Sequence, residues 1–158
     1  MGTYVEHHAS LDATGMRIAI VAGRFNDHVT RPLLDGARHT LEQAGAEPAR
    51  VYWVPGAFEV PLLAKKLAES GRVDAVVCLG AVIRGDTPHF EYVAGECARG
   101  LMQVTLETGV PIVFGVLTTE NLDQALQRSD LDGDNKGEEA ARTALEMVDL
   151  LRRLPSAD

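Results

Sequence analysis

The sequence predicts a three-layer α/β/α fold around a four-stranded parallel sheet, and two observations carry this prediction. Short apolar runs alternate with longer segments in which apolar residues recur at helical spacing. Strands joined by helices in this way form parallel sheets through right-handed crossovers. One run, residues 75–83, is apolar throughout apart from Gly80, as expected of a strand that helices cover on both faces. The chain has 158 residues, enough for one domain with a substantial core. We expect that domain at residues 15–154, after a polar N-terminal arm at residues 1–14.

Each element begins or ends at a recognisable residue. The first strand is a short β-branched run that stops at Gly23, and the helix after it stops at Gly45. Pro32 and Pro61 fall early in the first two helices, where a missing N–H costs little. Thr119 is in position to cap a short helix, and a polar loop at 130–137 precedes the last one. The expected strands are 17–22, 51–54, 75–83 and 112–117, and the expected helices are 27–45, 58–70, 87–107, a short segment around 122–126, and 138–153.

The composition excludes several classes of partner. The net charge of −8 argues against nucleic acid and against an anionic membrane, because a phosphate backbone needs a basic face. No apolar window approaches the roughly 18 residues of a membrane span, and the N-terminus lacks a signal pattern. We therefore expect a cytoplasmic protein, in which Cys78 and Cys97 are reduced and mostly buried.

The predicted sheet has one edge at which a ligand is expected to bind. In open parallel sheets, ligands bind beyond the carboxyl ends of the strands. The loops that follow the four strands hold a large share of the aromatic and polar functional groups of the chain. These loops are residues 23–26, 56–59, 84–89 and 118–119.

The segment Gly85–His89 joins a strand end to the start of a helix. Free N–H groups and the helix dipole attract anions at such a place, and Asp86, Thr87 and His89 would supply the donors. The residues alone are equally compatible with a plain capped helix, and the Asp86 carboxylate is an awkward neighbour for an anion. His89 is the best general acid/base candidate, because imidazole titrates near ~6.5 and a phosphate dianion nearby would raise its pKa. An exposed or capping histidine is the alternative.

Three phenylalanines and two charged residues are further candidates. Phe25 and Phe58 follow strand ends and Phe114 lies in the fourth strand; each could stack on a planar heterocycle or simply belong to the core. Glu59 could accept hydrogen bonds from hydroxyl groups or favour a helix start. Arg128 could reach an anion or be an ordinary surface arginine.

Other catalytic and metal-binding patterns are absent from the sequence. No G-x-S-x-G motif supports acyl transfer by serine, and no G-x-G-x-x-G follows the first strand. Cys97 lies eight residues from His89, about 12 Å along one helix, which is too far for a thiolate–imidazole pair. No cluster of histidine and cysteine has zinc spacing, and the aspartates at 130–134 lack the glycine and glutamate of a calcium loop.

Several segments of the sequence point to one known family when they are taken together, although none of them is specific for it alone. They occur in this order: Arg24-Phe25-Asn26, Gly56-Ala57-Phe58-Glu59-Val60-Pro61, Val82 to Val93, Gly115 to Asn121, and Asn135-Lys136-Gly137. In this order they resemble the 6,7-dimethyl-8-ribityllumazine synthases, which catalyse the penultimate step of riboflavin biosynthesis. The resemblance is collinear from about residue 17 to the last helix.

The resemblance implies a flavodoxin-like fold and a specific reaction. In that family, 5-amino-6-(D-ribitylamino)uracil condenses with 3,4-dihydroxy-2-butanone 4-phosphate and releases phosphate and water. The substrate supplies the amine for Schiff-base formation, so the resemblance implies neither a cofactor nor a metal.

The resemblance also implies roles for individual residues. By position, Phe25 matches the ring-stacking residue and His89 the residue that transfers protons. Phe114 and Arg128 match residues contributed by the neighbouring subunit, with Arg128 facing the phosphate. The remaining matches are Ala57, Phe58 and Glu59 on the ribityl side, Ala81, Val82 and Ile83 against the pyrimidine, and Asp86 and Thr87 in the phosphate loop.

The family assembles as pentamers, and some members form shells of sixty subunits. The resemblance therefore implies a homo-oligomer, possible association with riboflavin synthase, and an arm at residues 1–14 that adds to a neighbour's sheet edge. Two alternatives stay open: a flavin- or lumazine-binding shell protein with little catalysis, and a monomeric flavodoxin-like binding module.

Overall fold

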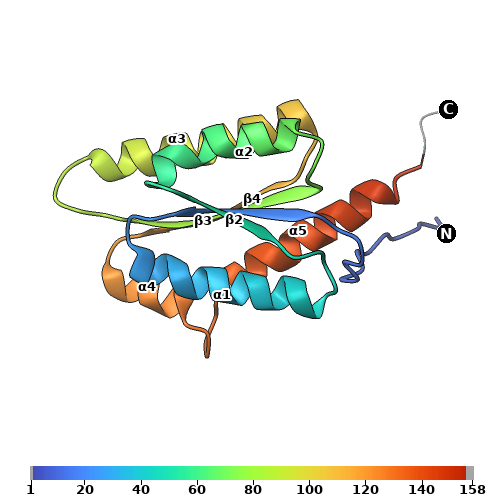
Figure 1. Ribbon diagram of the computed structural model, residues 1–158, viewed down its shortest axis with the longest axis horizontal. Helices are drawn as coiled ribbons and strands as arrows, with labels where there is room; N and C mark the ends of the chain where they lie inside the picture. The colour runs from blue at the N-terminus through green and yellow to red at the C-terminus, as the bar shows by residue number, and fades with distance from the viewer. Residues whose placement is uncertain (1, 156–158) are drawn as a thin grey trace.

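A parallel sheet with strand order β2-β1-β3-β4 divides the protein into three layers in the computed structural model, which describes residues 2–155 (Figure 1). All three strand pairs are parallel, which confirms the predicted fold class, and the order is that of flavodoxin-like sheets. The elements are β1 (Ile18–Gly23), α1 (Asp27–Gln43), β2 (Arg50–Val54), the 3-10 turn η1 (Ala57–Glu59), α2 (Val60–Glu69), β3 (Ala75–Ile83), α3 (His89–Thr108), β4 (Ile112–Thr119), α4 (Leu122–Ser129) and α5 (Lys136–Arg152).

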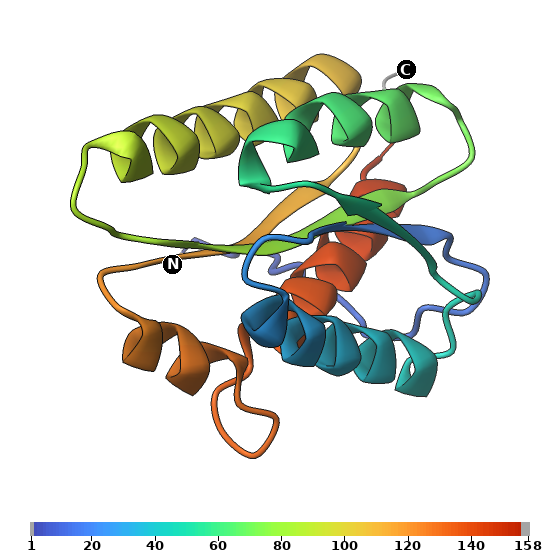
Figure 2. The same ribbon diagram turned by 60° about the vertical axis from the view of Figure 1, so that its left-hand side comes forward.

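Helices α2 and α3 cover one face of the sheet, and α1, α4 and α5 cover the other (Figures 1 and 2). Alternate residues of the central strands feed two separate cores. Val77 and Leu79 of β3 pack on the α1/α5 side, whereas Val76 and Cys78 pack on the α2/α3 side. Strand β3 is buried along almost its whole length, which explains why its sequence is apolar without alternation.

Some local details differ from the prediction. Thr119 is the last residue of β4, and the cap of α4 is Asn121, whose side chain accepts the Gln124 N–H at 2.9 Å. Helix α5 begins at Lys136 rather than at 138. Pro32 lies inside α1, beyond its first turn, so its missing N–H removes a helical hydrogen bond, contrary to the expectation of a small cost.

The N-terminal arm is exposed at nearly every residue up to Asp12. Ala13 is buried in the core, and its N–H donates to Ala44 O at 2.9 Å. Burial thus begins at Ala13, although the Ser10 N–H already donates to Asp149 Oδ2 on α5 at 2.9 Å. Within residues 2–155, no helix is both long enough and apolar enough to cross a membrane.

Helices α1 and α5 approach each other closely at two glycines. A Cβ on Gly137 would lie 1.9 Å from Leu33 O, and one on Gly36 would lie 2.4 Å from Asn135 Oδ1. The buried Asn135 side chain donates to Pro32 O at 3.1 Å and to Ser129 O at 2.8 Å, and it accepts the Glu138 N–H that starts α5. The Asn135-Lys136-Gly137 sequence therefore fixes α5 against α1 and the end of α4.

We expect Gly137→Ala to lower the free energy of unfolding by about 1–3 kcal/mol or more, because the added methyl group must push α5 away from α1. Gly95→Ala is the matched control: it also adds a methyl group inside a helix, but it meets no atom within 4 Å. The control should be neutral or more stable by up to about 1 kcal/mol. Denaturant titration measures both, and a Gly137→Ala variant as stable as the wild type would contradict the close contact.

Candidate functional site

The loops after β1 and β2 lie against each other at the carboxyl edge of the sheet. The Arg24 N–H donates to Val54 O at 2.8 Å and the Phe25 N–H to Pro55 O at 2.9 Å. A Cβ on Gly56 would lie 2.5 Å from the Phe25 ring, so the ring rests on the bare backbone of Gly56. The Phe25 side chain is nevertheless 60% exposed. The backbone of Gly56 therefore supports one side of the Phe25 ring, while the rest of the ring is open to solvent.

Asn26 connects this loop to the neighbouring strand. Its φ of 61° is left-handed, a conformation that asparagine tolerates better than most residues. Its side-chain amide donates to Ala81 O on β3 at 3.0 Å. From this point β1 leads to α1 on one face of the sheet and β3 leads to α3 on the other (Figure 2). In open parallel sheets, ligands usually bind where neighbouring strands lead to opposite faces in this way.

The segment after β2 supplies a buried alanine, an exposed ring and a carboxylate. Ala57 is buried, whereas Phe58 is 58% exposed. Glu59 is exposed, and its Oε2 accepts the Gly56 N–H at 3.0 Å, which turns the carboxylate back over the loop. The other carboxylate oxygen has no hydrogen-bond partner within residues 2–155 and can accept one from a ligand hydroxyl.

The end of β3 and the segment after it differ in exposure. Ala81 and Val82 are buried and Ile83 is half-buried, so the strand end presents mainly its backbone and the Ile83 side chain. Asp86 and Thr87 are exposed in the segment that follows.

The amides of this segment are available to a ligand. Across the described part of the chain, the N–H groups of Gly85, Asp86 and Thr87 donate to no protein acceptor. The Thr87 hydroxyl oxygen accepts the His89 N–H at 3.4 Å, a weak local contact. His89 is exposed and is the first residue of α3. Free amides next to a helix start can receive an anion, and the imidazole lies beside them in the sequence.

Arg84 lies between this segment and the sheet. Its Nε donates to Glu120 Oε2 at 2.7 Å, and its guanidinium also donates to Glu91. The hydrogen bond from Arg84 holds the pKa of Glu91 below its ordinary value. The Arg84 guanidinium carbon is 4.4 Å from the centre of the Phe90 ring.

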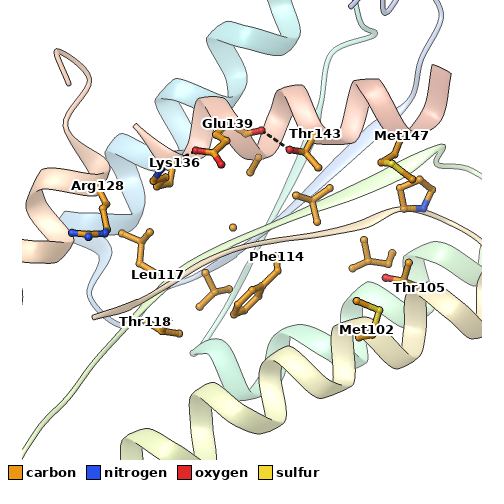
Figure 3. A pocket seen from close by; sticks show the side chains of 16 residues that line it. Met102, Thr105, Phe114, Leu117, Thr118, Arg128, Lys136, Glu139, Thr143 and Met147 are labelled. Carbon is orange, nitrogen blue, oxygen red and sulfur yellow. Dashed lines mark hydrogen bonds and ion pairs between the residues drawn. The ribbon is translucent and has the colours of Figure 1, made fainter. Parts of the chain in front are cut away.

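Phe114 and Arg128 lie elsewhere, in a groove of about 530 Å³ along the free edge of β4 (Figure 3). Phe114 is in the middle of the strand, opposite Cys78, and is 44% exposed. Arg128 lies in the last turn of α4, and its guanidinium donates to Gln124 O at 3.0 Å. Lys136, at the start of α5, lines the same groove.

The structure thus brings the predicted site residues to two places. Phe25, the 57–59 segment, the end of β3 and the 86–89 segment meet at the carboxyl edge of the sheet. Phe114 and Arg128 face the free edge of β4 instead. Arg128 belongs to the layer of α1, α4 and α5, whereas Asp86 precedes α3 in the opposite layer (Figure 1). No ion pair joins these two side chains within residues 2–155.

Three residues at these places were not predicted as site residues. Asn26 and Arg84 belong to segments that the sequence does single out, but their partners at 81, 91 and 120 are distant along the chain. Lys136 belongs to the Asn135-Lys136-Gly137 segment, and its ammonium pairs with Asp134 and Glu139 at 2.9 Å each. Across residues 2–155, no group of three or more histidine, cysteine, aspartate or glutamate side chains could hold a metal ion.

Comparison with known proteins gives one consistent result. The family model for 6,7-dimethyl-8-ribityllumazine synthase matches residues 15–152. A protein of that name from Syntrophus aciditrophicus is 57% identical over 146 residues, which cover 91% of this chain and 95% of the relative. A second from Thermus thermophilus is also 57% identical, covering 91% and 93%. A third from Protochlamydia amoebophila is 50% identical over 151 residues, covering 94% and 88%.

These matches span the whole sheet and both places where the predicted site residues lie. The chain belongs to the 6,7-dimethyl-8-ribityllumazine synthase family.

Proposed function

We propose that the protein is a transferase that condenses 5-amino-6-(D-ribitylamino)uracil with 3,4-dihydroxy-2-butanone 4-phosphate. The products are 6,7-dimethyl-8-ribityllumazine, phosphate and water, in the penultimate step of riboflavin biosynthesis. The observation that carries this proposal is the meeting of an exposed ring, a set of free amides and a histidine at one sheet edge of a chain from this family.

The pyrimidine would bind on the side of β1 and β2. Phe25 has an open face on which a flat heterocycle can stack. The ribityl chain carries hydroxyl groups, which the free oxygen of Glu59 can accept, while Ala57 and Phe58 provide apolar contact. Backbone groups at residues 81–83 would bind the polar edge of the pyrimidine, next to the hydrogen bond from Asn26 to Ala81 O.

The phosphate would bind to the segment after β3. The free N–H groups of Asp86 and Thr87 and the Thr87 hydroxyl are donors of the kind that phosphate oxygens require. The exposed Asp86 carboxylate opposes an anion here, so a cation from outside this segment is needed. Arg128 of a neighbouring subunit would supply it.

His89 would move protons between the two halves of the reaction. The amine of the pyrimidine attacks the ketone and forms a Schiff base with loss of water, so the protein needs no nucleophile of its own. Elimination of phosphate then requires a proton to leave carbon, and ring closure requires further proton transfers; the imidazole of His89 can serve both. Holding both substrates together itself lowers the barrier to a bimolecular reaction.

The protein would act in the cytoplasm as a homo-oligomer, either a pentamer or a sixty-subunit shell, and riboflavin synthase is a candidate partner. Support comes from the free edge of β4, where Phe114 and Arg128 line an open groove away from His89. A neighbour whose carboxyl edge faced this groove would complete the site. The arm at residues 1–14 would then add to a neighbour's sheet edge.

His89→Ala should lower kcat by about 10- to 100-fold, because proton transfer is lost while the binding residues remain. Lumazine absorbance and released phosphate measure the reaction in parallel. His39→Ala, an exposed histidine on α1, is the matched control and should react like the wild type. Wild-type protein that binds flavin or lumazine but forms no product above the uncatalysed rate would favour the shell-protein alternative over the enzyme.

Arg128→Ala should raise KM for the phosphorylated substrate by about 10- to 100-fold, since a charge-assisted hydrogen bond contributes roughly 1.5–3 kcal/mol. The KM for the pyrimidine should stay within about twofold, because the stacking side is unchanged. Arg38→Ala on α1 removes the same charge outside the groove and serves as control. An unchanged KM for the phosphorylated substrate in Arg128→Ala would remove Arg128 from the phosphate site.

A further inference from the structure

Arg84 connects three parts of the chain through one side chain. Its backbone N–H donates to Thr119 O at 2.9 Å and so continues the pairing of β3 with β4 beyond Ile83. Its guanidinium contacts Glu120 in the turn after β4 and Glu91 in the first turn of α3. The backbone of Arg84 is thus fixed to the sheet while its side chain holds the start of a helix.

The segment that follows has little else to hold it. Residues 85–88 are exposed, and across residues 2–155 their hydrogen bonds reach only to the first turn of α3. A Cβ on Gly85 would meet no atom within 4 Å, so the segment stands clear of the rest of the protein. The first residue of α3 that is fully buried is Cys97, more than two turns after His89.

Two side-chain contacts hold the first turn of α3, and Val93 and Ala94 pack against the same core in the turn that follows. Phe90 is half-buried against the core on the α2/α3 side, and the Arg84 guanidinium covers its ring at 4.4 Å. Glu91 is held by Arg84. His89 lies directly before both of these residues, so the position of its imidazole depends on the same two contacts.

We propose that Arg84 is a positioning residue for the reaction, which sets the location of His89 and of the Asp86 and Thr87 amides without binding substrate itself. Two carboxylates already offset the positive charge of Arg84, which makes it a poorer partner for a phosphate than an unpaired arginine. The planar guanidinium is required, because a lysine ammonium cannot lie flat on Phe90 while it donates in two directions. This inference rests on the proposed function for its kinetic part only.

The kinetic test compares Arg84→Lys and Arg84→Gln with the wild type. Both should lower kcat by about tenfold or more, because a small displacement of a catalytic group costs a large part of the rate. The KM for the pyrimidine should stay within about twofold. Glu120→Gln should lower kcat in the same direction by less, since Glu91 still holds Arg84. Arg99→Gln removes an arginine from the exposed face of α3 and should leave kcat unchanged.

A structural test is independent of activity. Hydrogen–deuterium exchange of a peptide covering residues 85–96 should be faster in Arg84→Gln and Arg84→Lys than in the wild type or in Arg99→Gln, with circular dichroism confirming that all variants are folded. If the wild type formed no lumazine, the proposed function would fail while the exchange result would still decide whether Arg84 holds this segment.

Two kinetic outcomes and one exchange outcome would overturn the inference. Arg84→Lys with the kcat of the wild type would show that charge alone suffices. A rise in KM for the phosphorylated substrate with an unchanged kcat in Arg84→Gln would make Arg84 a phosphate ligand. Unchanged exchange in folded Arg84→Gln would show that the segment is held by other contacts.

Discussion

The position of β4 at the end of the sheet is the constraint on which the proposed site depends. Because the strand order is β2-β1-β3-β4, one edge of β4 has no partner strand among residues 2–155. Phe114 and Arg128 face that open edge, while His89 and Phe25 lie beyond the carboxyl ends of the strands. Within residues 2–155, no hydrogen bond or ion pair joins Arg128 to the residues at the carboxyl edge. If one reaction uses all of these residues, a neighbouring subunit would supply one group, as proposed above.

At the carboxyl edge, the chain holds reactive and binding groups in place with few side-chain contacts. Phe25 rests on the backbone of Gly56, and any side chain at that position would displace the ring. Asn26 connects the loop after β1 to the neighbouring strand β3 with a single hydrogen bond. Arg84 connects the sheet to the start of α3 with one guanidinium. Each of these three contacts leaves the neighbouring predicted site residue exposed but held in position. Such an arrangement suits a reaction in which holding two substrates together supplies much of the acceleration.

The sequence predicts the sheet well, because β3 is uniformly apolar and the helices have clear periodicity and glycine stops. The bounds of β3 agree with the prediction, since both ends coincide with a change from apolar to polar residues. The prediction that Thr119 caps α4 was wrong. Thr119 and Asn121 are both residue types that cap helices, and only the length of β4 decides between them. The contacts of Arg84 could not be predicted, since Glu91 and Glu120 approach it only once α3 and β4 are folded. The roles of individual site residues remain predictions that depend on the family resemblance.

Mixing two impaired variants tests the central claim, a site divided between subunits, most directly. The His89→Ala and Arg128→Ala proteins are mixed in equal amounts, dissociated together and reassembled. The mixture is then assayed at a concentration of phosphorylated substrate far below the KM of the Arg128→Ala variant. If the two residues come from different subunits, about a quarter of the sites in a random closed ring regain both, and activity rises well above that of either variant alone. If His89 and Arg128 of the same chain formed the site, no mixed site would hold both residues. The activity of the mixture would then be no more than the mean of the two variants, which would contradict the account.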